Sequence, residues 1–151
     1  MPNSVVCVDA GLIMRTLVPG PFTSEALALL RGWRRDKTSL IAPALLAFEV
    51  TSVLRRYVHL GRISLAHGDA AFEAFQRLDI RLSHRQGIFP LAWDLAKRFN
   101  RPRAYDTTYL AYAQLNDCDF WTTDTRLHNT VKQTFDWVHW IGDCDPVEGG
   151  R

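Results

Sequence analysis

The sequence predicts a three-layer α/β/α fold around a mostly parallel five-stranded sheet. Short, apolar segments that are typical of buried strands alternate along the chain with longer segments of helical periodicity. Such alternation is typical of domains in which helices cover both faces of a parallel sheet. In addition, two of the short segments, residues 5–9 and 118–124, end in aspartate. A carboxylate is therefore expected at the carboxyl ends of two strands, where ligand sites form in such sheets.

The first half of the chain supplies two strands and three helices. Residues 5–9 (VVCVD) predict a buried strand, and the following residues 11–21 predict a turn of helix that ends at proline and glycine. A threonine or serine cap precedes apolar residues at helical spacing over 23–36. Residues 39–43 (SLIAP) predict a second strand, and 44–62 predict a long amphipathic helix that Gly61 stops.

The second half of the chain continues the alternation. It predicts helices over 64–78, 87–100, 104–113 and 125–134, and strands over 79–84, 118–124 and 136–141. In the helix that begins at 104, Tyr105, Tyr109 and Leu110 are expected to supply the apolar surface. We expect residues 1–142 to form one domain and residues 143–151 a flexible tail.

Composition bounds the class of protein. The chain has 151 residues, of which 47% are hydrophobic and 23% charged, as in an ordinary globular domain. Its longest apolar stretch, 40–48, contains a proline and is too short to span a membrane. The N-terminus lacks the basic start of a signal peptide, so we expect a cytoplasmic protein. Three widely spaced cysteines match neither a disulfide framework nor a zinc site.

Four acidic residues have unusual placements. Asp9 and Asp124 end two predicted strands, and they face one crevice if these strands are neighbours where the strand order changes direction. Glu49 lies on the apolar side of its helix, where a charge is costly unless it is paired or bound to metal. Asp106 lies at the opening of the helix in AYDTTYLAYA.

Each of these acids also has a plain structural explanation. Asp9, Asp106 and Asp124 could cap helices or close turns, and Glu49 could pair with an arginine. If all four meet at one rim, however, they repel one another and raise one another's pKa unless a cation neutralises them. Hard oxygen ligands of this kind suit Mg²⁺ or Mn²⁺.

Four segments together resemble one family. VVCVDAG, APALLAFEVTSVLRR, AYDTTYLAYA and FWTTDTRL are similar, in this order, to segments of the PIN-domain ribonucleases, and most closely of the VapC-type toxins of type II toxin–antitoxin pairs. The resemblance covers the chain up to its C-terminal tail and implies a PIN-like fold. It implies catalytic and metal-binding roles for Asp9, Glu49, Asp106 and Asp124, with Thr122 at the family's hydroxyl position.

The resemblance further implies a Mg²⁺- or Mn²⁺-dependent endoribonuclease in which a metal-activated water attacks the scissile phosphate. It also implies a small antitoxin partner, and we expect a homodimer. One departure is Gly11, where the family commonly has serine or asparagine, so a hydrogen bond near the metal is missing. Thr122 or backbone groups could substitute for it.

RNA contacts are assigned to basic side chains near these acids. Arg101 and Arg103 are the best candidates, followed by Arg126 and, more weakly, Arg15 and Lys132. Net charge is only +2, but with four of the 16 acids in one site, 12 acids stand against 18 basic residues on the remaining surface.

The five tryptophans are expected mostly to pack in the core rather than to stack on bases, and Trp121 in particular is expected to be buried. Two other functions stay open. One is a non-catalytic PIN module that binds RNA or protein, which Gly11 alone favours. The other is a receiver-like phosphoacceptor domain, which would need an acid beside Asp9 and a lysine at a late strand end, and neither is present.

Overall fold

The computed structural model describes residues 4–144, and within them five strands form one sheet of order β3-β2-β1-β4-β5. All four neighbouring pairs are parallel. The strands are β1 (Val5–Val8), β2 (Ser39–Pro43), β3 (Ile80–Ser83), β4 (Asp119–Thr122) and β5 (Val138–Trp140). The predicted five-stranded sheet is therefore confirmed, and its strands are parallel throughout this part of the chain.

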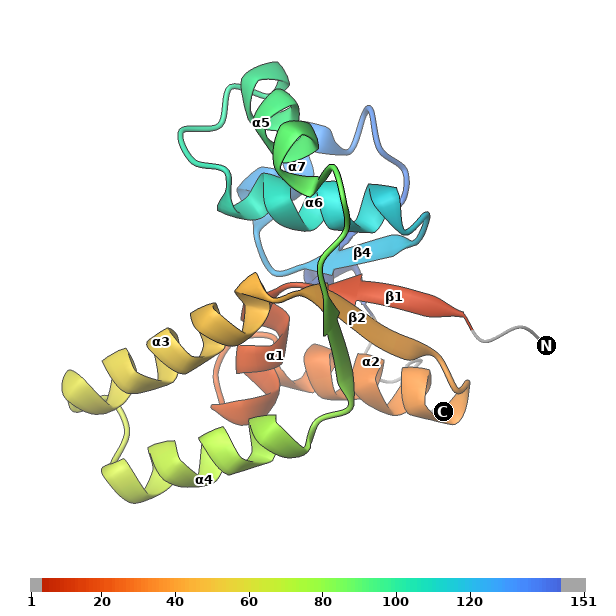
Figure 1. Cartoon of the computed structure of the whole chain (residues 1–151). Coiled ribbons are helices and arrows are strands. Elements are labelled where there is room, and N and C mark those ends of the chain that lie inside the picture. Colours follow the sequence, from red (N-terminus) through yellow and green to blue (C-terminus); the bar gives the residue numbers. More distant parts are fainter. Residues whose placement is uncertain (1–3, 145–151) are drawn as a thin grey trace.

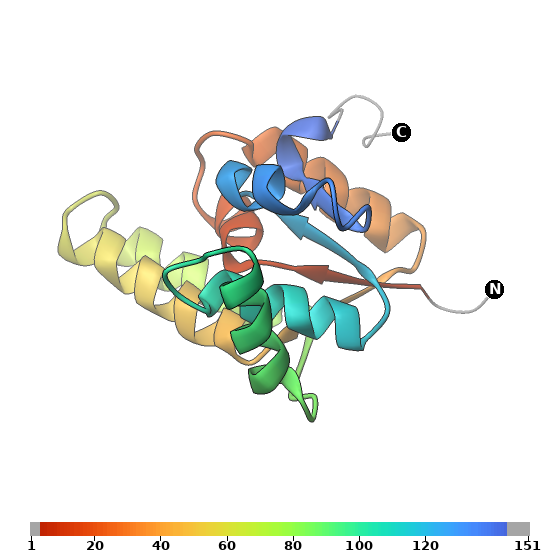
Figure 2. The ribbon, with the colours of Figure 1, turned by 90° about the horizontal axis from the view of Figure 1, so that it is seen from above.

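Helices cover both faces of the sheet and complete the predicted three layers (Figure 1). The helices are α1 (Ala10–Leu17), α2 (Thr23–Arg35), α3 (Leu45–His59), α4 (Leu65–Arg77), α5 (Ile88–Arg98), α6 (Tyr105–Leu115) and α7 (Thr125–Val131). A 3₁₀ turn over Ile141–Asp143 follows β5. Helices α1 to α4 lie on one side of the sheet and α5 to α7 on the other, and the view from above shows α6 running alongside β1 (Figure 2).

Local sequence explains where these helices begin and end. Ser64 caps α4 by accepting a 3.0 Å hydrogen bond from the His67 N–H. At the end of α3, Gly61 adopts a φ of 73°, and the Arg62 N–H donates to the carbonyl of Tyr57 at 2.9 Å. This is the Schellman arrangement that favours glycine, so the predicted stop at Gly61 is confirmed.

The core lies between the three inner strands, β2, β1 and β4, and the helices on either side. Val8, Ile41 and Phe120 are buried on the strands, and α6 adds Leu110 and Tyr112. Because α6 is buried over most of its length, it is fixed firmly against the sheet, and its N-terminus has a fixed position at the sheet's edge.

Three aromatic side chains differ from expectation. Tyr105 is 58% exposed and Trp93 65% exposed, so neither packs in the core. Trp121 is half-buried, and its ring lies edge-on to Trp33 at a centroid distance of 6.3 Å. The remaining tryptophans, Trp33, Trp137 and Trp140, are half-buried and pack against the core as predicted. Trp93 differs because the face of α5 that carries Phe89 and Trp93 is left uncovered.

The predicted tail falls mostly outside the described residues, which end at 144, although Asp143 belongs to the 3₁₀ turn. No helix in the described part of the chain is both long and apolar enough to cross a membrane.

Candidate active site

A cavity of about 560 Å³ opens at the carboxyl ends of β1 and β4, and all four predicted acids line it. The strand order changes direction between these two strands, because the chain moves from β1 to β2 on one side and returns to β4 on the other. Loops diverge at such a point and leave a crevice. The sequence prediction that Asp9, Glu49, Asp106 and Asp124 lie together agrees with this geometry.

Asp9 follows β1 directly and caps α1. Its Oδ1 accepts a 2.8 Å hydrogen bond from the Leu12 N–H. Its Oδ2 accepts bonds from the Thr122 hydroxyl at 2.6 Å and from the Thr123 N–H at 3.2 Å. The pKa of Asp9 is raised to about 6, mainly because the carboxyl is buried. The three hydrogen bonds lower this pKa, and the nearby charge of Glu49 raises it. The same carboxylate therefore caps α1 and lines the cavity.

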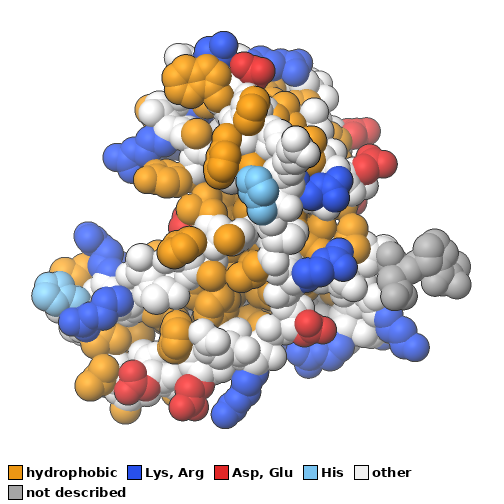
Figure 3. Space-filling view, in the orientation of Figure 1, with side chains coloured by type: hydrophobic (Ala, Val, Ile, Leu, Met, Phe, Trp, Pro, Cys, Tyr) orange, Lys and Arg blue, Asp and Glu red, His pale blue; other side chains and the backbone are white. Residues whose placement is uncertain are grey.

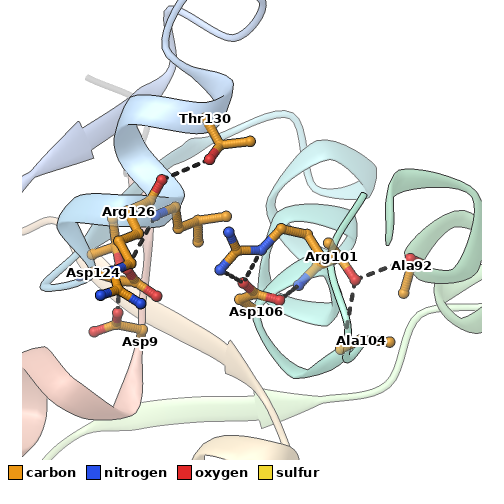
Figure 4. A network of polar contacts seen from close by, with 11 residues as sticks. Asp9, Ala92, Arg101, Ala104, Asp106, Asp124, Arg126 and Thr130 are labelled. Carbon is orange, nitrogen blue, oxygen red and sulfur yellow. Dashed lines mark hydrogen bonds and ion pairs between the residues drawn. The ribbon is translucent and has the colours of Figure 1, made fainter. Parts of the chain in front are cut away.

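Thr122 joins the ends of the two central strands. It is fully buried at the end of β4, donates to Asp9, and accepts a 2.9 Å hydrogen bond from the Asp124 N–H. Asp124 in turn caps α7 by accepting a 3.0 Å bond from the Leu127 N–H. These bonds fix the two strand-end aspartates relative to one another. Figure 4 shows Asp9 and Asp124 near each other in the site.

Glu49 reaches the cavity from α3, and its partner is a tyrosine rather than an arginine. The Tyr109 hydroxyl, on α6, donates a 2.7 Å hydrogen bond to Glu49 Oε1. Burial raises the pKa of Glu49, the bond from Tyr109 lowers it, and the charge of Asp106 raises it. Tyr109 keeps its proton because burial and the charge of Glu49 raise its own pKa. The sequence analysis missed this role, although the three-residue spacing from Asp106 puts Tyr109 on the same face of α6.

Asp106 lies in the first turn of α6 and is paired with Arg101. Nη2 of Arg101 lies 2.8 Å, and Nε 3.0 Å, from the same carboxylate oxygen, Oδ2. The other oxygen, Oδ1, accepts a 2.9 Å bond from the Thr107 N–H. The cap residue of α6 is Ala104, so Asp106 stabilises the helix start without being its N-cap.

The donor set fits a hard divalent cation. It consists of carboxylate and hydroxyl oxygens, which Mg²⁺ and Mn²⁺ prefer. The repulsion that Glu49 exerts on Asp9, and Asp106 on Glu49, would be relieved by a cation. As arranged here, however, no three acidic, histidine or cysteine side chains among residues 4–144 form a ready metal cluster. Oδ2 of Asp106 is held by Arg101, so a cation that binds this oxygen would have to displace the guanidinium.

Gly11 has a structural explanation. A Cβ built at this position would overlap the Thr123 hydroxyl and lie 3.3 Å from the Thr123 Cβ. It would also lie 3.5 Å from Oδ1 of Asp9. The Thr123 side chain therefore occupies the space beside Asp9 that a serine or asparagine at position 11 would need, and it was not among the predicted site residues. Two consecutive threonines before a strand-end aspartate are the signal that could have indicated it.

The predicted RNA-binding residues divide into two groups. Arg101 and Arg103 line the cavity. Arg126 is exposed on α7, Lys132 is exposed just after it, and Arg15 is half-buried on α1, and none of these three side chains lines the cavity. The structure thus brings the two best candidates to the cavity wall, whereas the side chains of the weaker ones do not line it.

The comparison with known families agrees with the site. Residues 6–133 match the PIN domain. The chain belongs to the PIN-domain family. Among curated relatives, VapC ribonuclease Mb0985 of Mycobacterium bovis and Ribonuclease VapC9 of Mycobacterium tuberculosis are each 28% identical over 126 residues. Those matches cover 83% of this chain and 91% of each relative.

A solved structure has a similar overall fold. The crystal structure of PAE2754 from Pyrobaculum aerophilum superposes with a TM-score of 0.65 at 14% sequence identity, covering 93% of this chain and 92% of that one. At this identity the likeness concerns the fold. The receiver-like alternative is wrong, because residues 6–133 match the PIN domain.

Proposed function

We propose that this PIN-domain protein is a metal-dependent endoribonuclease whose active site is the four-acid cavity. The observation that carries the proposal is that Asp9, Glu49, Asp106 and Asp124 come from four separate segments and line one cavity. Structural caps alone would not need to converge in this way. Relatives that are named ribonucleases are 28% identical to this chain over 126 residues, which supports the same activity.

The roles follow from the contacts of each side chain. Asp9, Asp106, Asp124 and Glu49 would hold Mg²⁺ or Mn²⁺, which when bound supplies an activated water and neutralises charge on the scissile phosphate. Thr122 orients Asp9 and Asp124 by bonding to both segments. Tyr109 holds Glu49 in place. Arg103 lies on the cavity wall, where a guanidinium can bind a neighbouring phosphate of the RNA.

We further propose that the protein is the toxin of a type II toxin–antitoxin pair and acts on cytoplasmic RNA. The support is the VapC name of its relatives. A small antitoxin would then bind this chain and suppress its cleavage of RNA. Growth arrest on expression of the active chain, with relief by the product of an adjacent short reading frame, would test this part separately.

An uncovered apolar surface supports a homodimer. Phe48 on α3 and Phe89 on α5 are 72% and 68% exposed, and Trp93 lies one helical turn after Phe89 on the same helix. Figure 3 shows hydrophobic side chains gathered on this face of the molecule. Apolar patches of this kind mark protein interfaces. Light scattering should report a dimer that Phe89→Glu dissociates, whereas a monomeric wild type would contradict the proposal.

The nuclease proposal is tested with purified protein and an end-labelled single-stranded RNA. Internal cleavage should require Mg²⁺ or Mn²⁺ and stop in chelator. Glu49→Gln should lose most of this activity, while Asp69→Asn, which changes an exposed acid on α4, should keep it. If the folded wild type bound RNA but cleaved none under any metal condition, the non-catalytic PIN module would be the correct function.

A further inference from the structure

The cavity contains a positively charged side chain that is paired with one of its acids. Among the residues that the structure describes, Arg101 is the one basic side chain in an ion pair with an acid of the cavity. Both partners are largely shielded, with 20% of the Arg101 side chain and 21% of the Asp106 side chain exposed. Two guanidinium nitrogens lie within 3.0 Å of Oδ2, so this oxygen is occupied.

Backbone hydrogen bonds at the end of α5 hold Arg101 beside the cavity. Helix α5 ends in a Schellman arrangement, in which Asn100 adopts a left-handed φ of 51°. The Arg101 N–H donates to the Ala96 carbonyl at 2.8 Å, and the Asn100 N–H donates to the Lys97 carbonyl at 3.2 Å. Pro102 then restricts the chain further. The guanidinium therefore extends from a fixed backbone position rather than from a loosely held loop.

The other three acids have neutral partners. Asp9 accepts from the Thr122 hydroxyl and from backbone N–H groups, Glu49 accepts from the Tyr109 hydroxyl, and Asp124 accepts from the Leu127 N–H. These hydrogen bonds stabilise the carboxylates but do not balance their charge. Within residues 4–144, Asp106 alone among the four has a positively charged partner, and its charge acts on Glu49.

We propose that Arg101 is the resident counterion of the cavity, and that it competes with the divalent cation for Asp106. This inference rests on the proposed metal-dependent function. A cation that binds through Oδ2 of Asp106 must displace the guanidinium, because both would need the same oxygen. The apparent affinity for metal is then lowered by the fraction of molecules in which Arg101 holds the carboxylate.

The released arginine stays at the same cavity. Its backbone remains fixed at the end of α5 beside the cavity, so the guanidinium stays within one side-chain length of the cavity wall. There it would be available to the phosphate of bound RNA, which guanidinium groups recognise well. Metal entry would thereby convert a charge that neutralises the site into one that binds substrate.

The test measures Mn²⁺ binding to the metal-free full-length protein by calorimetry, together with melting temperatures in chelator and in saturating Mn²⁺. Arg101→Ala should bind Mn²⁺ about tenfold more tightly than wild type, if Asp106 is free in roughly one molecule in ten. Arg103→Ala is the matched control, because it removes the same charge from the same cavity wall and should change the affinity less than about threefold. Arg101→Lys keeps the charge without the two-nitrogen contact and should fall between these values.

The melts provide the second readout. In chelator Arg101→Ala should melt below wild type, because Asp106 is left without a counterion beside Glu49. In saturating Mn²⁺ this difference should disappear. An equal loss in both conditions, unchanged or weaker Mn²⁺ binding by Arg101→Ala, or equal tightening by Arg103→Ala would overturn the counterion role and leave the nuclease proposal standing. Failure of wild type and of every variant to bind Mn²⁺ would overturn both.

Discussion

The side chain of Thr123 occupies the space into which a side chain at position 11 would project. The two residues come from opposite sides of the β1–β4 junction, and both lie beside Asp9. Glycine at position 11 and threonine at position 123 are therefore a matched pair, because the Thr123 side chain fills the space that a larger residue at position 11 would need.

Gly11→Ser should destabilise the protein, because the new Cβ overlaps the Thr123 hydroxyl. Overpacking of this kind costs about 1–3 kcal/mol in free energy of unfolding. The double variant Gly11→Ser with Thr123→Ala should recover most of this loss, and denaturant unfolding of all four proteins measures the coupling. If Gly11→Ser unfolded like wild type, the two positions would not compete for space.

Tyr109→Phe should weaken both the fold and metal binding, because it removes the hydrogen bond to Glu49. Loss of a bond to a charged group costs about 1.5–3 kcal/mol, and the pKa of Glu49 should rise further without it. Tyr112→Phe is the control: Tyr112 is on the same helix as Tyr109, but its hydroxyl pairs with Ser83 on β3 and does not line the cavity. That variant should lose stability but keep its Mn²⁺ affinity, and equal affinities for all three proteins would contradict the role of Tyr109.

The stability of the metal-free protein should depend on the ionisation of Asp9. Its folded-state pKa of about 6 lies above the ordinary value of 3.8, so the folded state binds this proton more tightly than the unfolded state. Stability should therefore fall as pH rises from about 4 to about 6, by up to about 3 kcal/mol from this group, and then level off. Mn²⁺ binding should weaken below about pH 6, because the proton competes with the metal.

Melts of wild type and Asp9→Asn across this pH range, in chelator, isolate the contribution of Asp9. The gap between the two proteins should widen in favour of Asp9→Asn as pH rises. A constant gap would mean that Asp9 ionises without cost.

Arg103→Ala should reduce RNA affinity and its salt dependence. Arg103 lines the cavity three residues before Asp106. Losing one phosphate contact to a single strand should lower the slope of log affinity against log salt by about 0.7. Fluorescence anisotropy in chelator, which prevents cleavage, provides the measurement, and Arg31→Ala on α2 is the exposed control. If Arg31→Ala changed the slope and Arg103→Ala did not, the RNA would follow a different surface.

Much of this architecture is predictable because local patterns determine it. The apolar run at β1, the capping Ser64 and the helix stop at Gly61 each act within a few residues, so the sequence indicates them directly. The convergence of the four acids was predictable for a related reason: strand ends of a parallel sheet meet at one edge, and two of these strands end in aspartate.

Lateral contacts between distant segments were not predictable in the same way. The bond between Tyr109 and Glu49 joins residues 60 positions apart, and that between Thr122 and Asp9 joins residues 113 apart. Apolar spacing assigns a residue to a face but does not choose its partner across the cavity. The exposure of Trp93 was also not predictable from its apolar side chain. A large apolar residue on a helix need not face the core when part of that helix is left uncovered.

The most direct test of the central claim is RNA cleavage by folded Asp9→Asn protein, measured beside its melting temperature with and without Mn²⁺. This substitution keeps the size of the side chain and most of its capping ability, but removes one negative charge. If Asp9 holds the metal, cleavage should fall by at least about a hundredfold and Mn²⁺ should stabilise the variant less than wild type. In chelator the variant should melt no lower than wild type. Wild-type cleavage by well-folded Asp9→Asn protein would contradict the metal-binding role of Asp9.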